Sequence, residues 1–245
     1  MCRLFGMVSE KPEAISYWML DALRPFRSWS DVHCHGWGIG SYENGQPNLI
    51  KEPVSAKESP LFEKTSVEAK SSMVIGHIRK MTRGRQVIED THPFQYGQWL
   101  FGHNGTIDAD YFRERLNATH HGAVTGNSDS EVYFHYLLQG SEAGREPGLL
   151  NAIDEIRARE FSALNFILTD SGTLLVYWAQ VATAAQSLTP FYYQLYYTVR
   201  NSVDTGGKQV IVCSEKLDNL SWLEIPPRQL LKVSRACRVE FVPAR

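Results

Sequence analysis

Several features that would place a protein in a specialised class are missing from this sequence. Its four cysteines are scattered over 245 residues, which is too sparse for a disulfide framework and favours reduced thiols. Positive charge is not in excess, because 25 Lys and Arg stand against 27 Asp and Glu, so we expect no nucleic-acid partner. No apolar run approaches the roughly 20 residues that span a bilayer. The first segment has neither the basic start nor the apolar stretch of a secretory signal.

What is present is the composition of an ordinary globular protein. Hydrophobic residues make up 43% of the chain, which is enough to bury a sizeable core. Repeats, low-complexity tracts and linkers are lacking, so we expect a single domain over residues 1–245. Together these features predict a cytoplasmic protein without a membrane segment.

The apolar pattern predicts strands and helices in separate clusters. Strands are expected at 1–9, 36–42, 73–79, 99–101, 161–169, 173–178, 191–199 and 208–213. Helices are expected from Pro12 to about residue 23, after a capping box formed by Ser128 and Glu131, and at 149–156. Residues 47–60 are expected to be a polar loop and 103–105 a tight turn. Because strands and helices do not alternate regularly, the pattern favours an α+β fold with antiparallel sheets.

Cys2 is the first residue with candidate chemistry. Removal of Met1 would make Cys2 the N-terminus, and a free α-amine has a pKa near 7.7–8.0, so it can accept a thiol proton. Nucleophile and base would then belong to one residue. The alternative, from position alone, is that Cys2 is a small buried residue.

Three later motifs add polar groups at the ends of predicted elements. Arg79 follows a predicted strand and could hold a carboxylate through two parallel hydrogen bonds, or lie on the surface. Asn104-Gly105 could supply a side-chain and a backbone N–H to an oxyanion, or form an ordinary turn. Asp129 stands at a predicted helix start, where the helix dipole favours a carboxylate and where capping alone would explain it.

In this order, the motifs resemble the glutaminase domain of class II glutamine amidotransferases. That family has an N-terminal Cys, a strand ending in His-x-Arg with Thr and Gly after it, a His-Pro, a His-Asn-Gly and a Ser/Thr-Asp-Ser/Thr-Glu. The matching residues here are Cys2, His77-Ile78-Arg79 with Thr82 and Gly84, His92-Pro93, His103-Asn104-Gly105, and Ser128-Asp129-Ser130-Glu131. The MCRLFG start and Gly-Trp-Gly-Ile at 36–39 look most like stand-alone members, which include the γ-glutamyl hydrolase of ergothioneine synthesis.

The resemblance implies a fold and a role for each matching position. The fold would be the four-layer αββα sandwich of N-terminal-nucleophile hydrolases. Cys2 would be both nucleophile and base, while Asn104 and Gly105 would stabilise the oxyanion. Arg79 would bind the substrate α-carboxylate and Asp129 its α-ammonium. Thr82, in the loop that closes over glutamine, and His103 would complete the substrate site. No metal or other cofactor is implied.

Two departures from the family pattern affect the surroundings of the site. His35 stands where stand-alone relatives often have Asp before Gly-Trp-Gly, and Lys80 stands where many relatives have Trp. Neither change touches the expected chemistry.

Three functions are compatible with these residues. The protein could hydrolyse a γ-glutamyl amide, feed ammonia from glutamine to a separate synthase, or bind glutamine without catalysis. We favour the hydrolase, with glutamine or a γ-glutamyl compound as substrate; homo-oligomerisation stays open.

Two other patterns have simpler explanations. His33-Cys34-His35 could suggest a metal, but no second Cys/His pair follows nearby, so a structural or surface role is expected. The aromatic residues of 191–197 could stack on bases, but without a basic patch a strand with cross-strand aromatic pairs is favoured.

Overall fold

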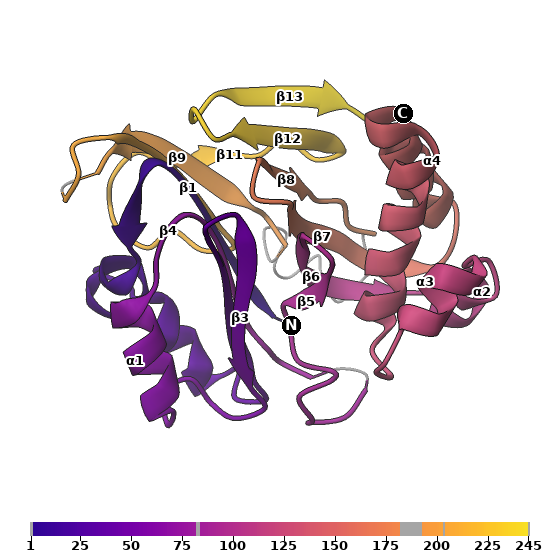
Figure 1. Ribbon diagram of the computed structural model, residues 1–245, viewed down its shortest axis with the longest axis horizontal. Helices are drawn as coiled ribbons and strands as arrows, with labels where there is room; N and C mark the ends of the chain where they lie inside the picture. Colours follow the sequence, from indigo (N-terminus) through magenta and orange to yellow (C-terminus); the bar gives the residue numbers. More distant parts are fainter. Residues whose placement is uncertain (1, 82–83, 182–192, 203, 245) are drawn as a thin grey trace.

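The computed structural model describes residues 2–81, 84–181, 193–202 and 204–244, and its strands form two antiparallel sheets (Figure 1). The first sheet contains, in spatial order, β11 (Leu223–Glu224), β9 (Tyr196–Asn201), β10 (Lys208–Cys213), β1 (Arg3–Ala14), β4 (Lys70–Ile78), β2 (Trp37–Glu43) and β3 (Gln46–Glu52). The second contains β13 (Val239–Pro243), β12 (Gln229–Ser234), β8 (Thr173–Tyr177), β7 (Phe161–Thr169), β6 (Trp99–Ile107) and β5 (Phe94–Tyr96).

Helices cover the outer face of each sheet. Packed on the first sheet are η1 (Tyr17–Asp21, one π-helical turn), η2 (Phe26–Asp31, a 3₁₀ helix) and α1 (Pro60–Glu68). On the other side of the molecule lie α2 (Ala109–Arg113), α3 (Ala118–Ala123) and α4 (Asp129–Arg157). The layers therefore follow the order α, β, β, α, and the expected α+β sandwich is confirmed. In the described part of the chain, no helix is long and apolar enough to cross a membrane.

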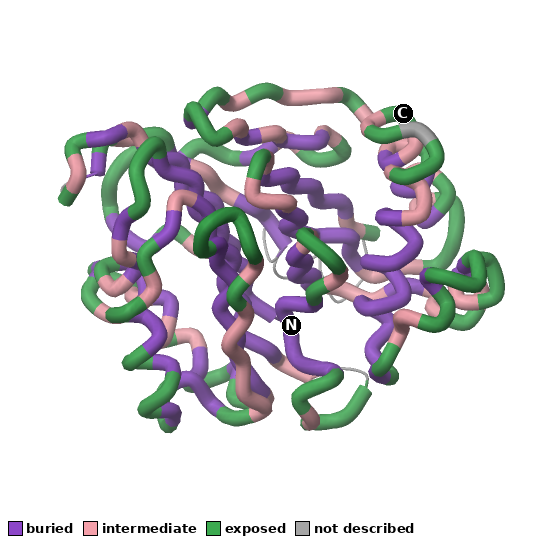
Figure 2. Tube along the Cα trace, in the orientation of Figure 1, coloured by how far each residue is buried: buried purple, intermediate pink, exposed green. Residues whose placement is uncertain are grey.

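The strand residues alternate between the core between the sheets and a core under the helices. Leu4 and Val8 of β1 face the second sheet, whereas Phe5 and Met7 pack toward η1 and α1. In β6, Leu100 faces the first sheet and Phe101 packs toward α4. This follows from the period of two along a strand, which sends successive side chains to opposite faces. Figure 2 shows the inner strands of both sheets largely buried, whereas the edge strand β13 is intermediate or exposed, as is β3.

The helix expected from Pro12 onward is wrong in its first part. Pro12 belongs to β1, which continues to Ala14, and only the single turn η1 follows. The pairing of β1 with β4 shifts register between Val8 and Glu13. Proline is tolerated at such an irregularity because the ladder hydrogen bond there is already interrupted.

The loop expected at 47–60 is wrong over residues 47–52 and correct over 53–59, and the turn expected at 103–105 is wrong. Residues 46–52 form β3, which pairs with β2 through a turn at Asn44-Gly45, where both residues have positive φ (50° and 78°). This Asn-Gly signal predicts a hairpin. The second Asn-Gly pair, Asn104-Gly105, instead lies inside the continuous strand β6. By contrast, the hairpin expected at 161–178 is confirmed as β7 and β8, and β10 matches the strand expected at 208–213. Of the strand expected at 191–199, residues 191–192 lie outside the described ranges, and β9 begins at Tyr196.

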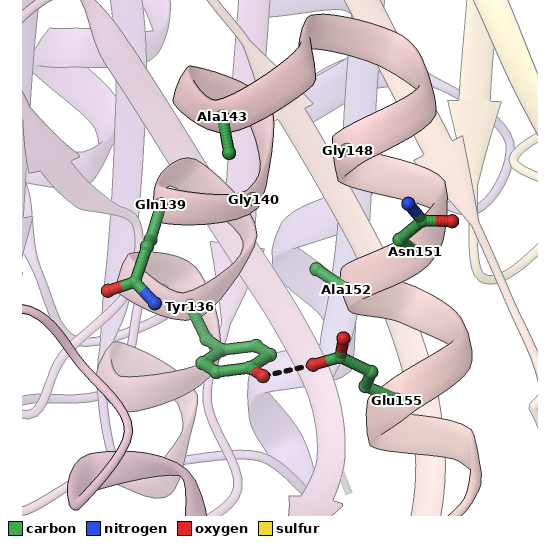
Figure 3. A pocket seen from close by; sticks show the side chains of 8 residues that line it. All are labelled: Tyr136, Gln139, Gly140, Ala143, Gly148, Asn151, Ala152 and Glu155. Carbon is green, nitrogen blue, oxygen red and sulfur yellow. Dashed lines mark hydrogen bonds between the residues drawn. The ribbon is translucent and has the colours of Figure 1, made fainter.

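α4 reverses its direction near Arg145, whose φ is +54°, so it forms two antiparallel arms (Figure 3). A Cβ on Gly148 would lie 2.0 Å from the carbonyl oxygen of Gly140, so both arms need glycine at this contact. Tyr136 on one arm donates a hydrogen bond to Glu155 on the other. The two arms correspond to the two helices expected from the sequence. Ser128 caps the first arm by accepting from the N–H of Ser130. The reciprocal half of the expected capping box is wrong, because the carboxylate of Glu131 accepts instead from the backbone N–H groups of Thr125 and Gly126.

Candidate active site

Cys2 lies between β6 and the segment that follows β4. The pairing of Arg3 in β1 with Ile78 in β4 places Arg79 and Lys80 beside Cys2. The backbone nitrogen of Cys2 donates a hydrogen bond to Oδ1 of Asn104 at 2.9 Å. Its Sγ accepts a hydrogen bond from the backbone N–H of Lys80 at 3.4 Å. The side chain is 9% exposed, so the thiol is sheltered from most of the solvent.

Opposing effects act on the Cys2 thiol. Burial raises the pKa of Cys2, because the thiolate loses hydration. The N–H of Lys80 and the positive charge of Arg79 act in the other direction and lower it. Arg79 and the amide of Lys80 therefore stabilise a negative charge on this sulfur.

Asn104 and Gly105 lie side by side in β6, opposite β7. Because Oδ1 of Asn104 accepts from Cys2, the Nδ2 group points the other way, and it has no hydrogen-bond partner among the described residues. Gly105 has a φ of +152°, and a Cβ there would lie 1.9 Å from the carbonyl oxygen of Ala163. Any other residue would push β6 away from β7, so glycine is required at this position.

Arg79 and Asp129 bring a buried cation and a buried anion to the same region. Arg79 is 3% exposed, and one guanidinium nitrogen donates to the backbone oxygen of Arg85 at 2.7 Å. Burial lowers the pKa of Arg79, while the charges of Cys2, Asp90 and Asp129 raise it, so all three lie within electrostatic reach. Asp129 is 6% exposed and begins α4, where the helix dipole favours its carboxylate. Its Oδ2 accepts from the N–H of Ile107 at 3.0 Å.

Asp90 joins the loop after Arg79 to the loop before Asp129. Its two carboxylate oxygens accept from the backbone N–H groups of Arg85 and Asn127, each at 2.6 Å, and the residue is fully buried. It was missed by the sequence analysis. The one available signal was its position two residues before His92-Pro93.

His103 is held by protein atoms at both ring nitrogens. Nε2 lies 3.2 Å from the carbonyl oxygen of Ala163, which can only accept, so Nε2 carries the proton. Burial lowers the pKa of His103, so the ring is neutral and Nδ1 accepts from the hydroxyl of Ser130 at 2.8 Å. These contacts favour a role for His103 in positioning the start of α4, next to Asp129. The substrate contact expected for His103 stays a prediction.

Two further histidines support the segment under the site. His77 donates from Nε2 to the backbone oxygen of His103 at 3.1 Å, and its ring stacks on that of His92 with centroids 4.2 Å apart. Burial lowers the pKa of His77 to about 3, so it is neutral at physiological pH. Both residues belong to the motifs singled out in the sequence, and both pack inside the protein.

Three other residues singled out in the sequence are Thr82, His35 and Cys34. Thr82 lies outside the described ranges. His35, at one of the departures from the family pattern, accepts from the backbone N–H of Met81 through Nδ1 at 3.3 Å and so supports the same loop. Its neighbour Cys34 is exposed, and no cluster of three metal-binding side chains occurs among the described residues.

Comparison with known proteins gives three informative similarities. The chain is 30% identical to an uncharacterized protein of Methanocaldococcus jannaschii over 72% of this chain, but it spans only 50% of that relative. It is 26% identical to the γ-glutamyl-hercynylcysteine sulfoxide hydrolase of Mycobacterium tuberculosis, covering 96% of this chain and 94% of the hydrolase. A class II glutamine aminotransferase domain protein from Silicibacter pomeroyi has the same fold, with a TM-score of 0.67, 21% identity and 95% of each chain covered.

The family model of class II glutamine amidotransferases matches residues 1–242, nearly the entire chain. That match includes every motif that meets at Cys2. This chain therefore belongs to the class II glutamine amidotransferases.

Proposed function

We propose that this protein is an amidohydrolase that attacks the γ-amide of glutamine or of a γ-glutamyl compound through the thiolate of Cys2. The observation that carries the proposal is the placement of Cys2 against Asn104, with Arg79 and Asp129 in the same buried region. Cleavage of an amide on an amino-acid side chain requires a nucleophile, two N–H donors for the oxyanion, and a pair of opposite charges for the α-amino and α-carboxylate groups.

The reaction begins with proton transfer within Cys2. After removal of Met1, the nitrogen that lies 2.9 Å from Asn104 Oδ1 is a free amine, and it takes the proton from Sγ. The thiolate then forms a bond to the γ-carbonyl carbon. Negative charge develops on the carbonyl oxygen, where Nδ2 of Asn104 and the N–H of Gly105 donate hydrogen bonds.

Collapse of the tetrahedral intermediate completes the first half of the reaction. The C–N bond breaks, the Cys2 ammonium gives its proton to the departing nitrogen, and a γ-glutamyl thioester remains. Water then attacks the thioester, with the amine of Cys2 again as base. Glutamate leaves and the thiol is restored, so no other reactant is consumed.

Arg79 and Asp129 would hold the amino-acid end of the substrate. The guanidinium of Arg79 would bind the α-carboxylate through two parallel hydrogen bonds. The carboxylate of Asp129, already accepting from Ile107 with one oxygen, would bind the α-ammonium with the other. Asp90 would keep the two loops in register. Thr82 would complete the loop over the substrate.

Similarity over 94% of the length of the M. tuberculosis hydrolase favours hydrolysis of a γ-glutamyl compound by one domain that extends over 1–245. The second candidate, a glutaminase that supplies ammonia to a separate synthase, has the same first half-reaction. The two differ in the leaving group, since a dedicated hydrolase needs room for a larger amine.

The test combines protein mass and substrate preference. Intact mass spectrometry should find that the active protein begins at Cys2, because an acylated nitrogen cannot be a base. A panel of glutamine and γ-glutamyl amides of larger amines should show faster hydrolysis of at least one larger amide. Full activity in a homogeneous Met1-retaining protein would contradict the mechanism. Binding of glutamine without turnover would support the non-catalytic alternative instead.

A further inference from the structure

Both backbone ends of Cys2 are held by side chains, one from each face of the first sheet. The nitrogen of Cys2 donates to Oδ1 of Asn104, which belongs to the second sheet. The carbonyl oxygen of Cys2 accepts from the guanidinium of Arg3, whose Nη1 lies 3.1 Å away. This guanidinium lies 4.9 Å from the ring centre of Trp29 in η2, on the face that the helices cover. Arg3 therefore contacts Cys2 from the face opposite to Asn104.

The guanidinium of Arg3 is itself fixed by Glu215. Nη2 of Arg3 and Oε1 of Glu215 form an ion pair at 3.0 Å. The segment after β10 stays beside β1, because the N–H of Ser214 donates to the backbone oxygen of Leu4 at 3.0 Å and the N–H of Leu4 donates to the hydroxyl of Ser214 at 2.9 Å. Arg3 is 6% exposed. A buried guanidinium that binds a carboxylate and a carbonyl oxygen at once keeps one orientation.

Arg3 also places a positive charge near the thiol of Cys2. Burial raises the pKa of Cys2, and the charges of Arg79 and Arg3 are among the effects that lower it. Loss of a proton by Cys2, from the thiol or from the ammonium, leaves one more negative charge, so a nearby cation favours that loss. The carboxylate of Glu215 acts in the other direction, because it offsets the charge of Arg3.

The other titratable groups around this ion pair lie on the segments packed against it. Burial raises the pKa of Glu215, whereas the charges of Arg3 and Arg24, which follows η1, lower it. Burial raises the pKa of Tyr196 in β9 and raises that of Cys213 in β10 to about 12, so both stay neutral at physiological pH. Nζ of Lys216 lies 4.7 Å from the ring centre of Tyr196. Glu215 is thus the anion that contacts Arg3 directly.

We propose that Arg3 is a positioning residue for Cys2: it fixes the carbonyl oxygen of Cys2 and supplies a positive charge that favours loss of its proton. Glu215 orients the guanidinium and moderates its charge. The inference rests on the proposed function, because it gives Arg3 a part in the proton transfer that starts the reaction.

The test measures how fast iodoacetamide alkylates Cys2 in the full chain at a series of pH values, followed by mass spectrometry of the peptide that contains Cys2. The thiolate is the form that reacts. Arg3→Met removes the charge, so the rise in rate should move to higher pH, by about half a pH unit or more. Glu215→Gln keeps a hydrogen-bond partner for the guanidinium but removes the offsetting charge, so the rise should move to lower pH. Arg3→Lys keeps the charge and should stay close to the parent protein.

Two controls accompany the measurement. Cys34 is exposed and reacts in the same sample, and its pH dependence should be the same in every variant. Arg238→Met makes the same change of charge at an exposed position between β12 and β13, and should leave the pH dependence of Cys2 alkylation unchanged. The pH dependence of kcat/KM for glutamine should move in the same directions as the alkylation of Cys2.

Thermal melting identifies any variant that has lost the fold. An unchanged pH dependence of Cys2 alkylation in folded Arg3→Met would overturn the proposal. Movement in the same direction in Arg3→Met and Glu215→Gln would indicate a distorted strand end in place of an effect of charge, and would overturn it as well. Alkylation does not require amide hydrolysis. Absence of hydrolysis in the parent protein would therefore contradict the proposed function without obscuring the effect of Arg3 on Cys2.

Discussion

The backbone nitrogen of Cys2 and the side-chain oxygen of Asn104 lie 2.9 Å apart, although 102 positions separate them in the sequence. This one hydrogen bond joins the residue that precedes β1 in one sheet to β6 in the other. It also orients the Asn104 amide, because its oxygen faces Cys2 and its Nδ2 faces away. The proposed nucleophile and the proposed oxyanion donor are therefore placed by the same contact.

Diazo-oxo-norleucine, a glutamine analogue with an electrophilic side chain, should label Cys2 and no other cysteine. Cys34 is exposed but has no neighbouring glutamine site, and burial raises the pKa of Cys213 to about 12 and that of Cys237 to about 11. Peptide mapping after labelling gives the result. An adduct on Cys34 or Cys213 would overturn the assignment of the nucleophile, and Cys2→Ala should remove labelling altogether.

Arg79→Lys should raise KM with little change in kcat. Lysine keeps the charge but loses the paired geometry, and one charge-assisted hydrogen bond contributes about 1.5–3 kcal/mol, or roughly ten- to hundredfold in affinity. Arg85→Lys is the matched control, because its side chain is exposed and the contact with Arg79 uses only its backbone oxygen. Steady-state kinetics with glutamine as substrate would measure KM and kcat of both variants. An unchanged KM in Arg79→Lys would exclude the carboxylate contact.

Asn104→Asp should lower kcat about a hundred- to a thousandfold, equivalent to about 2.7–4 kcal/mol of transition-state stabilisation. Aspartate has nearly the same size but places a negative charge against the developing oxyanion. Because Asn104 lies within the continuous strand β6, a role in shaping a turn cannot explain such a loss. The measurement is kcat beside thermal melting on one preparation. Near-normal kcat in a stable variant would remove Asn104 from the mechanism.

His77→Gln should reduce the loss of stability in acid. The pKa of His77 is about 3 in the folded protein and near 6.5 when unfolded, so between these values the unfolded chain binds the extra proton. Stability is therefore lost as pH falls below about 6.5, by up to about 1.4 kcal/mol per pH unit from this group. Urea unfolding between about pH 7 and pH 4 would measure the slope.

The control for the histidine experiment is His121→Gln, which makes the same substitution at an exposed position of α3. The pH dependence of the stability of this control variant should match that of the parent protein. If His77→Gln also keeps the full acid slope, the buried ring is not the source of the proton uptake.

The order of motifs along the chain was sufficient to predict the family and the αββα fold. It also singled out Cys2, Arg79, Asn104 and Asp129, which the fold brings into one buried region and whose catalytic and binding roles stay predictions. Candidate residues of this kind can be identified from sequence because the proposed chemistry requires particular side chains. The alternating apolar residues of β1 and β6 likewise follow from the local period of two. His77 and His92 were found as motif members, but their packing was not.

Other features of the site could be determined only from the tertiary structure, because they depend on contacts between segments that are distant in the sequence. Asn104-Gly105 has the local preference of a turn, yet it stays within β6 because the carbonyl of Ala163, from β7, occupies the space where a Cβ would lie. In the sequence, Asp90 is not distinguished from the other carboxylates. Its role becomes visible only in the folded protein, where it accepts hydrogen bonds from the N–H groups of Arg85 and Asn127. Burial and hydrogen-bond partnership are properties of the packed chain, so no local pattern encodes them.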